Sequence, residues 1–429
     1  MKVMRPSLLQ PMLRSVTSNT LHIQSKTLSS LPLEGVKVVD MTRVLAAPYA
    51  TMNLSDLGAD VIKVERPGIG DETRKWGPPF LSPTLSNYFA CCNRNKRSIV
   101  VDYTTHDGQV IIKKLMAQSD VFVENLKPGT LKKYKLDYEN IKSSNEELIF
   151  ASLSGYGQDG PYSKQGAYDV PLSAEGGLMG ITGPVDGEPV KVGVALTDIC
   201  SGLYLYSSIV AALYHRTKTG LGQQIDVSMF STQLSMLVNV ASNYLNSGII
   251  AKPLGSSHLS IVPYQAFKTS DAYVVIAANN DSQFYDLSEA VGWPWLPSNP
   301  MFSTNELRVE NSEELLKHLT ERFAEETTEY WVDIASSFSF TAAPINNIQE
   351  AFEHPQAIHS DIVKTVHNEV DDVDIKVVGH PVKFNGKDPN NYTAPPVLGQ
   401  HTISILQDLG YSDEEIRVLQ KKNIIQSAT

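Results

Sequence analysis

Two apolar stretches with a helical pattern between them constrain the fold of this chain most. Residues 35–42 (GVKVVDMT) and 60–67 (DVIKVERP) both have the β-branched composition of a buried strand. The segment between them reads as a turn and a helix that starts near Pro48 and ends near Gly58. A strand, a helix and a second strand this close together form a βαβ unit, which requires a parallel sheet. The sequence therefore predicts an α/β fold.

The same strand pattern recurs along the first half of the chain. Further strands are expected at residues 98–103, 120–125, 148–153 and 223–229, and a helix that is apolar nearly all round, and so buried, at 198–215. A second region starts near residue 250, with a strand at 272–278 and amphipathic helices at 281–292, 312–325 and 328–337. We expect a large domain over 34–235, a smaller α/β domain over 250–355 and a C-terminal return to the large domain over 375–429.

The composition excludes several classes of protein. The hydrophobic content of 42% with 19% charged residues is typical of a globular protein. The net charge of −11 argues against a nucleic acid or a membrane surface as the main partner, and no apolar run approaches the length of a membrane-spanning helix. The three cysteines, Cys91, Cys92 and Cys200, lack the spacing of a metal site and are too few for a disulfide framework. We expect a reducing compartment and no bound metal.

The first 33 residues differ from the rest of the chain. They are rich in serine and threonine, carry four basic residues and contain no acid before Glu34. This composition predicts a mitochondrial transit peptide over 1–33, since a secretory signal would need a longer apolar core. A disordered tail is the alternative.

The segment 154–170, SGYGQDGPYSKQGAYDV, is the most suggestive candidate site. Four glycines and a proline follow the strand at 148–153 and lead to one isolated carboxylate, Asp169. Glycines at the carboxyl end of a parallel strand suit a ligand-binding loop. Asp169 can be a nucleophile, or it can cap the helix expected near Val170. The residues by themselves leave both interpretations open.

The chain lacks the fingerprints of several common enzyme classes. It has no G-x-G-x-x-G in the first turn, no G-x-x-x-x-G-K-[ST] and no G-x-S-x-G. No histidine lies between His106 and His215 to pair with Asp169 locally. Basic residues cluster at 65–79 and 93–98, the first including Arg66 at a strand end. Each cluster by itself can be a solvated loop or part of a site for a phosphorylated ligand. The presence of two such clusters in an acidic protein favours the phosphorylated ligand.

The order of motifs resembles one known family over nearly all of 34–425. The stretches GVKVVDMTRVLAAP, GADVIKVERPGIGDETR, NRNKRSIVVD, DVFVENLKPG, SGYGQDGPY, AYD and KTGLGQ are similar to those of the class III CoA-transferases. Within this family, GSSHLSIVPYQAFKT and PPVLGQHT most resemble mitochondrial members that act on dicarboxylates. The resemblance implies an enzyme that moves CoA from succinyl-CoA to glutarate or 3-hydroxy-3-methylglutarate. It also implies a Rossmann-like large domain and an interlocked homodimer in the mitochondrial matrix.

The resemblance implies roles for particular residues. Asp169 becomes the nucleophile, forming a mixed anhydride and then an enzyme–CoA thioester. CoA, a substrate rather than a cofactor, is expected to bind at Val44, Ala46, Arg66, Val101, Asn125, Leu126 and Lys133. Acceptor contacts are expected from Arg43, Tyr168, Ser257 and His258, although His258 can equally be a loop histidine without a ligand.

Two other functions stay open at this point. α-Methylacyl-CoA racemases share the family's fold but use a His/Asp pair, whereas this chain has Ala167-Tyr168-Asp169. A CoA-binding regulatory protein without activity is the second alternative, and the intact Asp169 argues against it.

Overall fold

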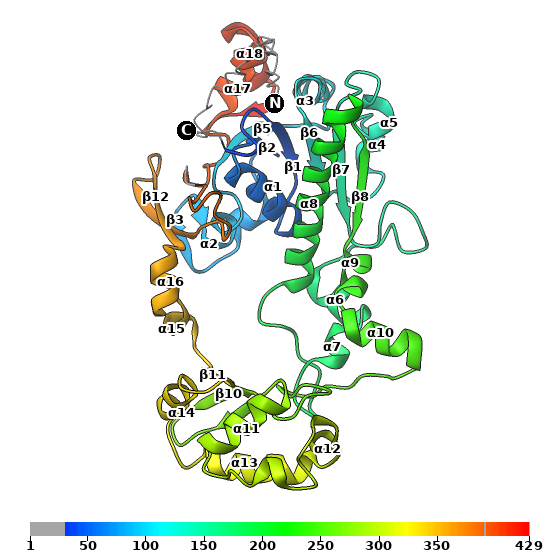
Figure 1. Cartoon of the computed structure of the whole chain (residues 1–429). Coiled ribbons are helices and arrows are strands. Elements are labelled where there is room, and N and C mark those ends of the chain that lie inside the picture. The colour runs from blue at the N-terminus through cyan, green and yellow to red at the C-terminus, as the bar shows by residue number, and fades with distance from the viewer. Residues whose placement is uncertain (1–30, 390–391, 429) are drawn as a thin grey trace, which may run out of the picture.

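A seven-stranded sheet forms the centre of the large domain (Figure 1). The computed structural model describes residues 31–389 and 392–428. In spatial order the strands are β14 (Ile425–Gln426), β5 (Lys96–Val101), β2 (Asp60–Glu65), β1 (Lys37–Met41), β6 (Val121–Glu124), β7 (Ile149–Ser154) and β8 (Gln224–Ser228). Every neighbouring pair is parallel except β14 with β5. The predicted α/β fold with a parallel sheet is confirmed.

Helices cover both faces of this sheet. One core contains Val38 of β1 and residues of α1 (Ala46–Asp56) and α8 (Leu196–Thr219). The other contains Val39 of β1 and residues of α3 (His106–Ala117), α17 (Thr402–Asp408) and α18 (Asp413–Lys421). Successive side chains of a strand point to opposite faces, so a strand covered on both sides buries both sets of side chains. This explains the β-branched stretches in the sequence, within which the charged residues Asp40 and Lys63 are also buried.

The expectation that the helix over 198–215 is buried all round is wrong. In α8, Leu205 and Ile209 are fully buried against the sheet and α1, but Tyr204 and Tyr214 are 48% and 64% exposed. The helix is long and apolar enough to cross a membrane by length and composition alone, a test that core helices of soluble proteins also pass. Apolar composition does not reveal which face of a helix meets the sheet.

The strand order reverses at β1. From β1 the chain proceeds to β2 and β5 on one side, and β6, β7 and β8 lie on the other. Ligands of open α/β sheets bind in the crevice at the carboxyl ends of the strands where the order reverses. Here that crevice lies between the segments that follow β1 and β6, at 42–45 and 125–128.

The small domain has an antiparallel sheet of its own. Its strands are β9 (Tyr264–Lys268), β10 (Tyr273–Ala277) and β11 (Thr341–Pro344), with β10 in the middle. The helices α11 (Asp281–Ala290), α12 (Asn305–Glu310), α13 (Ser312–Phe323) and α14 (Thr328–Ala335) accompany it. Trp331, Phe267 and Phe323 are buried in its separate core.

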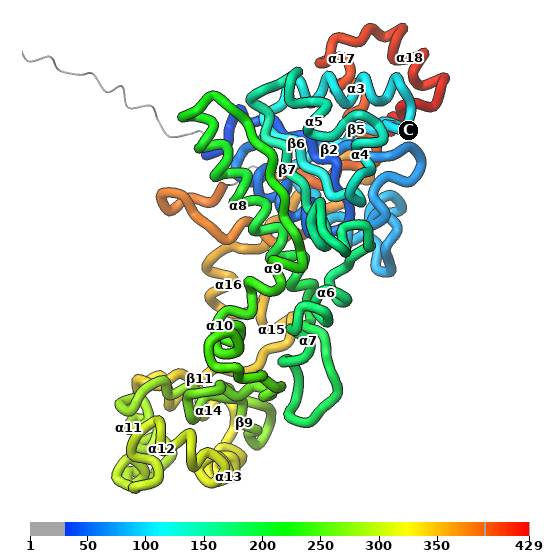
Figure 2. Tube along the Cα trace, turned by 90° about the vertical axis from the view of Figure 1, so that its right-hand side faces the viewer, coloured from blue at the N-terminus to red at the C-terminus, as the bar shows by residue number. Residues whose placement is uncertain are grey.

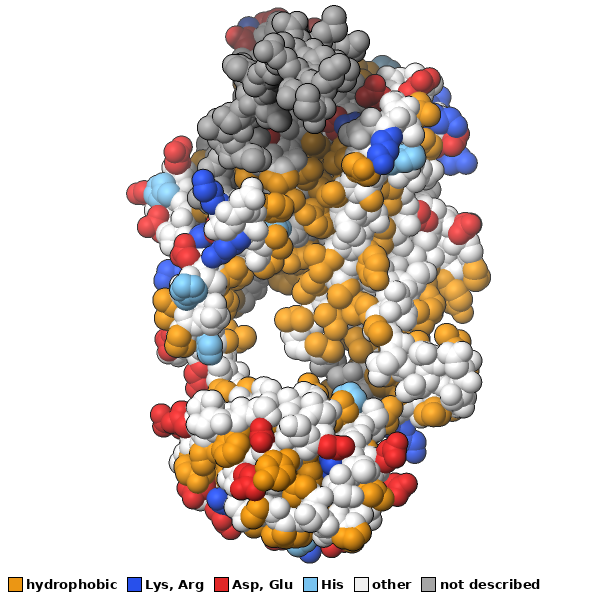
Figure 3. All heavy atoms as spheres, viewed as in Figure 1, with side chains coloured by type: hydrophobic (Ala, Val, Ile, Leu, Met, Phe, Trp, Pro, Cys, Tyr) orange, Lys and Arg blue, Asp and Glu red, His pale blue; other side chains and the backbone are white. Residues whose placement is uncertain are grey.

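Two extended connections join the domains (Figures 1 and 2). The chain leaves through α10 (Val238–Ser247) and returns through α15 (Ile348–Glu353) and α16 (Pro355–Ser360). The space-filling view shows an opening through the molecule between these connections (Figure 3). After the return, the hairpin of β12 (Val363–Asn368) and β13 (Val373–Val378) packs near β3 (Phe80–Ser82) and β4 (Leu85–Ser86).

Short elements complete the fold. They are η1 (Glu72–Lys75), α2 (Asn87–Ala90), α4 (Thr130–Lys133), α5 (Tyr138–Ile141), α6 (Asp169–Glu175), α7 (Leu178–Ile181), α9 (Met229–Ser235) and η2 (Leu296–Ser298). The predicted transit peptide, residues 1–33, lies almost entirely outside the described residues.

Candidate active site

The turn after β1 contains a backbone conformation that is costly for its residue. Val44 has φ +70°, a left-handed value that a β-branched side chain rarely adopts. Its amide donates to both carboxylate oxygens of Asp71, each at 3.3 Å. The Thr73 amide donates to Asp71 at 3.0 Å. Asp71 therefore ties the first turn to the segment that follows β2.

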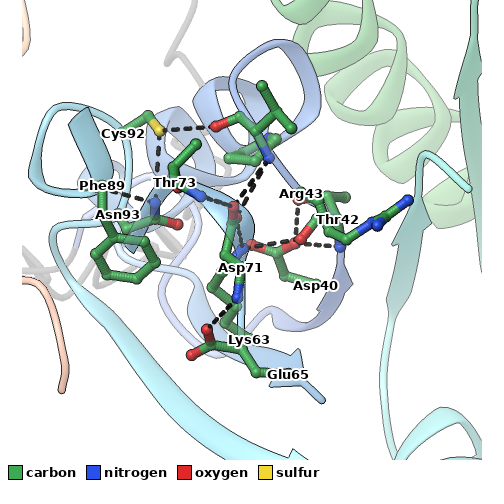
Figure 4. Close-up of polar contacts among 12 residues, drawn as sticks. Asp40, Thr42, Arg43, Lys63, Glu65, Asp71, Thr73, Phe89, Cys92 and Asn93 are labelled. Carbon is green, nitrogen blue, oxygen red and sulfur yellow. Dashed lines mark hydrogen bonds and ion pairs between the residues drawn. The ribbon is translucent and has the colours of Figure 1, made fainter. Parts of the chain in front are cut away.

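Buried charged side chains surround Asp71 (Figure 4). The ammonium of Lys63, whose side chain is fully buried, lies 3.1 Å from Asp71 and donates to the Thr42 carbonyl at 2.8 Å. Burial opposes the ionisation of Asp71, but the charge of Lys63 and the hydrogen bonds from Thr73 outweigh it and lower the pKa of Asp71. A second buried pair, Asp40 with Lys96 at 2.9 Å, lies beside them. Paired buried charges thus stabilise Asp71, which in turn holds the strained turn at Val44.

Asn125 joins the two sides of the crevice. The Arg43 amide donates to the Asn125 side-chain oxygen at 2.9 Å, and the Asn125 side-chain nitrogen donates to the Arg43 carbonyl at 2.8 Å. This reciprocal pair connects the segments that follow β1 and β6, so the crevice has a defined width.

A cleft of about 270 Å³ opens at this position. Six residues singled out in the sequence line it: Arg43, Val44, Ala46, Asn125, Leu126 and Tyr168. Leu153, Trp76 and Asp198 line it as well. Residues separated by more than 120 positions therefore meet where the topology predicts a ligand.

Asp169 begins the helix α6 next to this cleft. Its Oδ1 accepts hydrogen bonds from the amides of Thr197 at 2.8 Å and Asp198 at 3.3 Å, in the first turn of α8. These amides are free at a helix N-terminus and attract an anion. Within the described residues, Oδ2 makes no hydrogen bond. Asp169 thus caps α8 from a distance, which the sequence did not suggest, and one of its oxygens remains available.

Asp198 is a second carboxyl group at the same place. Burial, and then the negative charge of Asp169, raise the pKa of Asp198 to about 7. Tyr88 faces both acids; burial, with contributions from Cys91 and these acids, raises the pKa of Tyr88 to about 12. No ion pair within the described residues involves Asp198.

Arg66 lies beside the cleft in a smaller hollow that Arg43 also lines, together with Tyr103. Both guanidinium groups contact Glu72 Oε1, at 2.5 Å from Arg43 and 3.3 Å from Arg66. Tyr103 packs against Tyr134, with ring centres 5.5 Å apart. The Lys133 ammonium lies 5.2 Å from the centre of the Tyr134 ring. The half-exposed Arg43 and Arg66 therefore line one side of the site, whereas Lys133 is exposed and lines neither hollow.

Three predicted site residues lie elsewhere. Val101 is fully buried in a core, so its side chain offers no surface to a ligand in this structure. Ser257 and His258 belong to the segment before β9: Ser257 donates to Gln265 at 2.8 Å, and His258 stacks on Tyr264 with ring centres 5.4 Å apart. Neither lines the cleft of the same chain.

The sequence reasoning missed the acids of the site. Asp71 and Glu72 stand inside a stretch interpreted only as basic, and Asp198 opens a helix interpreted only as apolar. An acid in the first turn of an apolar helix was the available signal for Asp198. In 31–389 and 392–428, no group of His, Cys, Asp and Glu is arranged to hold a metal ion.

A family model and individual relatives match this chain. The model described as CoA-transferase family III matches residues 33–402. The human succinyl-CoA:glutarate CoA-transferase is 47% identical over 395 residues, which cover 92% of this chain and 90% of the relative. The succinate–glutarate CoA-transferase of Agrobacterium fabrum is 38% identical over 384 residues, or 88% of this chain and 96% of that one.

A solved structure has the same fold. The crystal structure of a CaiB/BaiF family protein from Brucella suis matches with a TM-score of 0.80 and 39% identity, covering 89% of this chain and all of that one. The resemblance stated from the motifs is confirmed. With its switch-point cleft and its match to the family model over residues 33–402, this chain belongs to CoA-transferase family III and is an enzyme that transfers CoA.

Proposed function

We propose that this enzyme moves CoA from succinyl-CoA to a dicarboxylate, glutarate or 3-hydroxy-3-methylglutarate, with Asp169 as the nucleophile. The observation that carries this proposal is the Asp169 carboxylate, held by two helix amides through Oδ1 while Oδ2 makes no hydrogen bond among the described residues. The names of the human and Agrobacterium relatives, which specify succinate or succinyl-CoA and glutarate, support the choice of substrates.

The chemistry requires only carboxylates and a thioester. Asp169 Oδ2 attacks the succinyl carbonyl, the carbon–sulfur bond breaks, and CoA leaves as a thiolate from a mixed anhydride. The thiolate then attacks Asp169 Cγ, which releases succinate and leaves an enzyme–CoA thioester. The acceptor carboxylate repeats the two steps in reverse and departs as its CoA thioester.

The lining of the cleft suggests how CoA is held. Val44 and Ala46 in the first turn would contact the nucleotide, and Asn125 and Leu126 the pantetheine arm. Arg66 and Lys133 would meet phosphates, for which a guanidinium supplies paired hydrogen-bond donors. Arg43 and Tyr168 would contact the acceptor. Val101 is fully buried in the sheet, so its side chain is not proposed as a CoA contact.

A homodimer would account for Ser257 and His258. They are separated from the cleft of their own chain, so they could contact an acceptor only at the cleft of a second copy. The exposed apolar side chains of α8, Tyr204 and Tyr214, and of α10, Leu245 at 77% exposure, would be covered in such an assembly. The opening between the connections is compatible with interlocked chains (Figure 3).

The deciding experiment uses Asp169→Ala. Wild-type enzyme mixed with succinyl-CoA should gain the mass of CoA on Asp169, and borohydride should reduce this thioester to an alcohol at position 169 with release of CoA. The variant should bind CoA but show neither adduct nor transfer. Substantial turnover by Asp169→Ala would refute the nucleophile. Exchange of the α-proton of a branched acyl-CoA would instead support a racemase.

We further propose location in the mitochondrial matrix. The support is the basic, acid-free composition of residues 1–33. N-terminal sequencing of the protein isolated from mitochondria should show a start near residue 34; an intact Met1 would contradict processing.

A further inference from the structure

Among the residues that the structure describes, Asp198 is the one acid that lines the cleft and has no role assigned above. It lies in the first turn of α8, and its own amide donates to Asp169 Oδ1 at 3.3 Å. Its side chain lines the cleft beside Leu153 and Tyr168. The two carboxyl groups therefore lie together at one helix N-terminus, and Asp169 occupies the amides of that terminus.

No neighbouring group neutralises Asp198. Across 31–389 and 392–428, it takes part in no ion pair, and its carboxyl oxygens accept no hydrogen bond. The titratable groups that face it are Asp169 from α6 and Tyr88 from α2. The other charged residues at the cleft are Arg43 and Glu72, which pair with each other, and Lys127.

A buried acid beside a second, ionised acid favours its neutral form. Burial is the first cause and Asp169 the second, and together they raise the pKa of Asp198 to about 7. Tyr88 stays protonated at neutral pH, because burial is the largest of several effects that raise its pKa to about 12. Asp198 is thus the group at this cleft that can both give and take a proton near neutral pH.

We propose that Asp198 is the proton donor and acceptor for the CoA sulfur. This proposal rests on the proposed function, in which Asp169 attacks the thioester. When the carbon–sulfur bond breaks, sulfur takes the bonding electron pair and the Asp198 proton, which leaves Asp198 as a carboxylate. The sulfur then attacks Asp169 Cγ, its proton returns to Asp198, and succinate leaves as a carboxylate. No proton is gained or lost overall.

The assignment explains why an acid is placed here. A thiolate, whose parent thiol has an ordinary pKa of about 8.5, takes a proton from a carboxyl group of pKa about 7, so Asp198 can supply that proton as the carbon–sulfur bond breaks.

The test is single-turnover formation of the enzyme–CoA thioester, measured by rapid quench and intact mass. In wild type the rate should fall as pH rises through about 7, because the starting form has Asp198 protonated. Asp198→Asn should form the adduct about 10²-fold more slowly and lose this pH limb. Asp198→Glu, which keeps a titratable group, should restore a limb and part of the rate.

A matched control is Glu124→Gln. Burial raises the pKa of Glu124 to about 7 as well, but Glu124 lines a separate cavity under α4 and α5 with Ser152. In this variant the rate of thioester formation should still fall as pH rises through about 7. A rate that no longer depends on pH in Glu124→Gln would assign this dependence to Glu124 and overturn the proposal.

The outcomes separate the two proposals. If wild type forms no adduct with succinyl-CoA, the proposed function fails and the role of Asp198 fails with it. If wild type forms the adduct and Asp198→Asn matches it in rate and pH profile, only the role of Asp198 is refuted. CoA affinity by calorimetry and the melting temperature should be unchanged in Asp198→Asn; a large loss of either, with Asp198→Glu equally impaired, would show a structural role instead.

Discussion

Replacing Asp71 by Asn should damage both stability and CoA binding. Asp71 is 1% exposed, accepts from the Val44 amide through both oxygens and lies 3.1 Å from the buried ammonium of Lys63. An amide of the same shape removes one charge and leaves Lys63 without the carboxylate that it pairs with. Breaking one side of a buried ion pair costs about 3–5 kcal/mol.

Part of this loss should disappear when both charges are removed. Lys63→Met replaces the partner with an apolar side chain of similar length, and Lys96 still neutralises Asp40 at 2.9 Å. Because the double variant leaves no uncompensated buried charge at this pair, it should be more stable than Asp71→Asn alone. The coupling energy should be about 1–3 kcal/mol.

The assays are urea unfolding and steady-state kinetics of the two single variants and the double variant. The unfolding midpoint should fall in Asp71→Asn and recover in the double variant, while the slope stays constant. KM for acyl-CoA should remain high in Asp71→Asn and in the double variant, since the new asparagine side chain offers the Val44 amide one uncharged acceptor in place of two carboxylate oxygens, and the left-handed conformation of Val44 costs about 1–3 kcal/mol. A loss of stability below about 1 kcal/mol, or strictly additive losses, would refute the account of the buried pair.

Three shorter predictions concern the same region. Arg66→Ala should raise KM for succinyl-CoA about tenfold, a loss of about 1.4 kcal/mol, but leave succinyl-pantetheine, which lacks the nucleotide, unaffected; equal effects on both thioesters would place Arg66 away from the phosphates. Val44→Gly should leave the free energy of unfolding within about 1 kcal/mol of wild type, because glycine adopts positive φ without strain; a larger loss in urea would show that the Val44 side chain matters more than its backbone. Acid should destabilise the protein through Asp71, whose pKa is lowered on folding: its contribution is present above the unfolded value of about 4 and is lost as pH falls through the folded value, so a stability curve flat below pH 4 would contradict the pairing.

The sheet could be predicted from the sequence because its signal is local. Strands such as 37–41 and 60–65 are covered on both faces and are rich in β-branched residues, although the buried charges Asp40 and Lys63 interrupt them. The edge strand β14 was not predicted: it has two residues, and its partner β5 lies more than 300 positions earlier. The face of α8 that stays exposed was also missed, since an apolar helix does not indicate which side is covered.

The candidate site was recognised through ordered motifs rather than through chemistry visible in any one residue. The residues themselves left Asp169 as either a nucleophile or a helix cap. In the structure, Asp169 begins its own helix and also accepts hydrogen bonds from backbone amides of α8, a helix that begins 27 positions later in the chain. No local pattern could show that contact, because it depends on where α6 and α8 lie relative to the sheet.

The sequence by itself determined the parallel sheet, the family and the identity of the carboxylate at 169. These three conclusions depend on the composition of short strands and on the order of motifs along the chain, both of which can be read without knowing how the segments pack. Only the tertiary structure decided that Asp198 lies beside Asp169, that Asp71 and Lys63 support the strained Val44, and that Ser257 lies away from the cleft of its own chain. Burial and charge pairing arise when distant segments pack together, so the ionisation of these groups is a property of the fold.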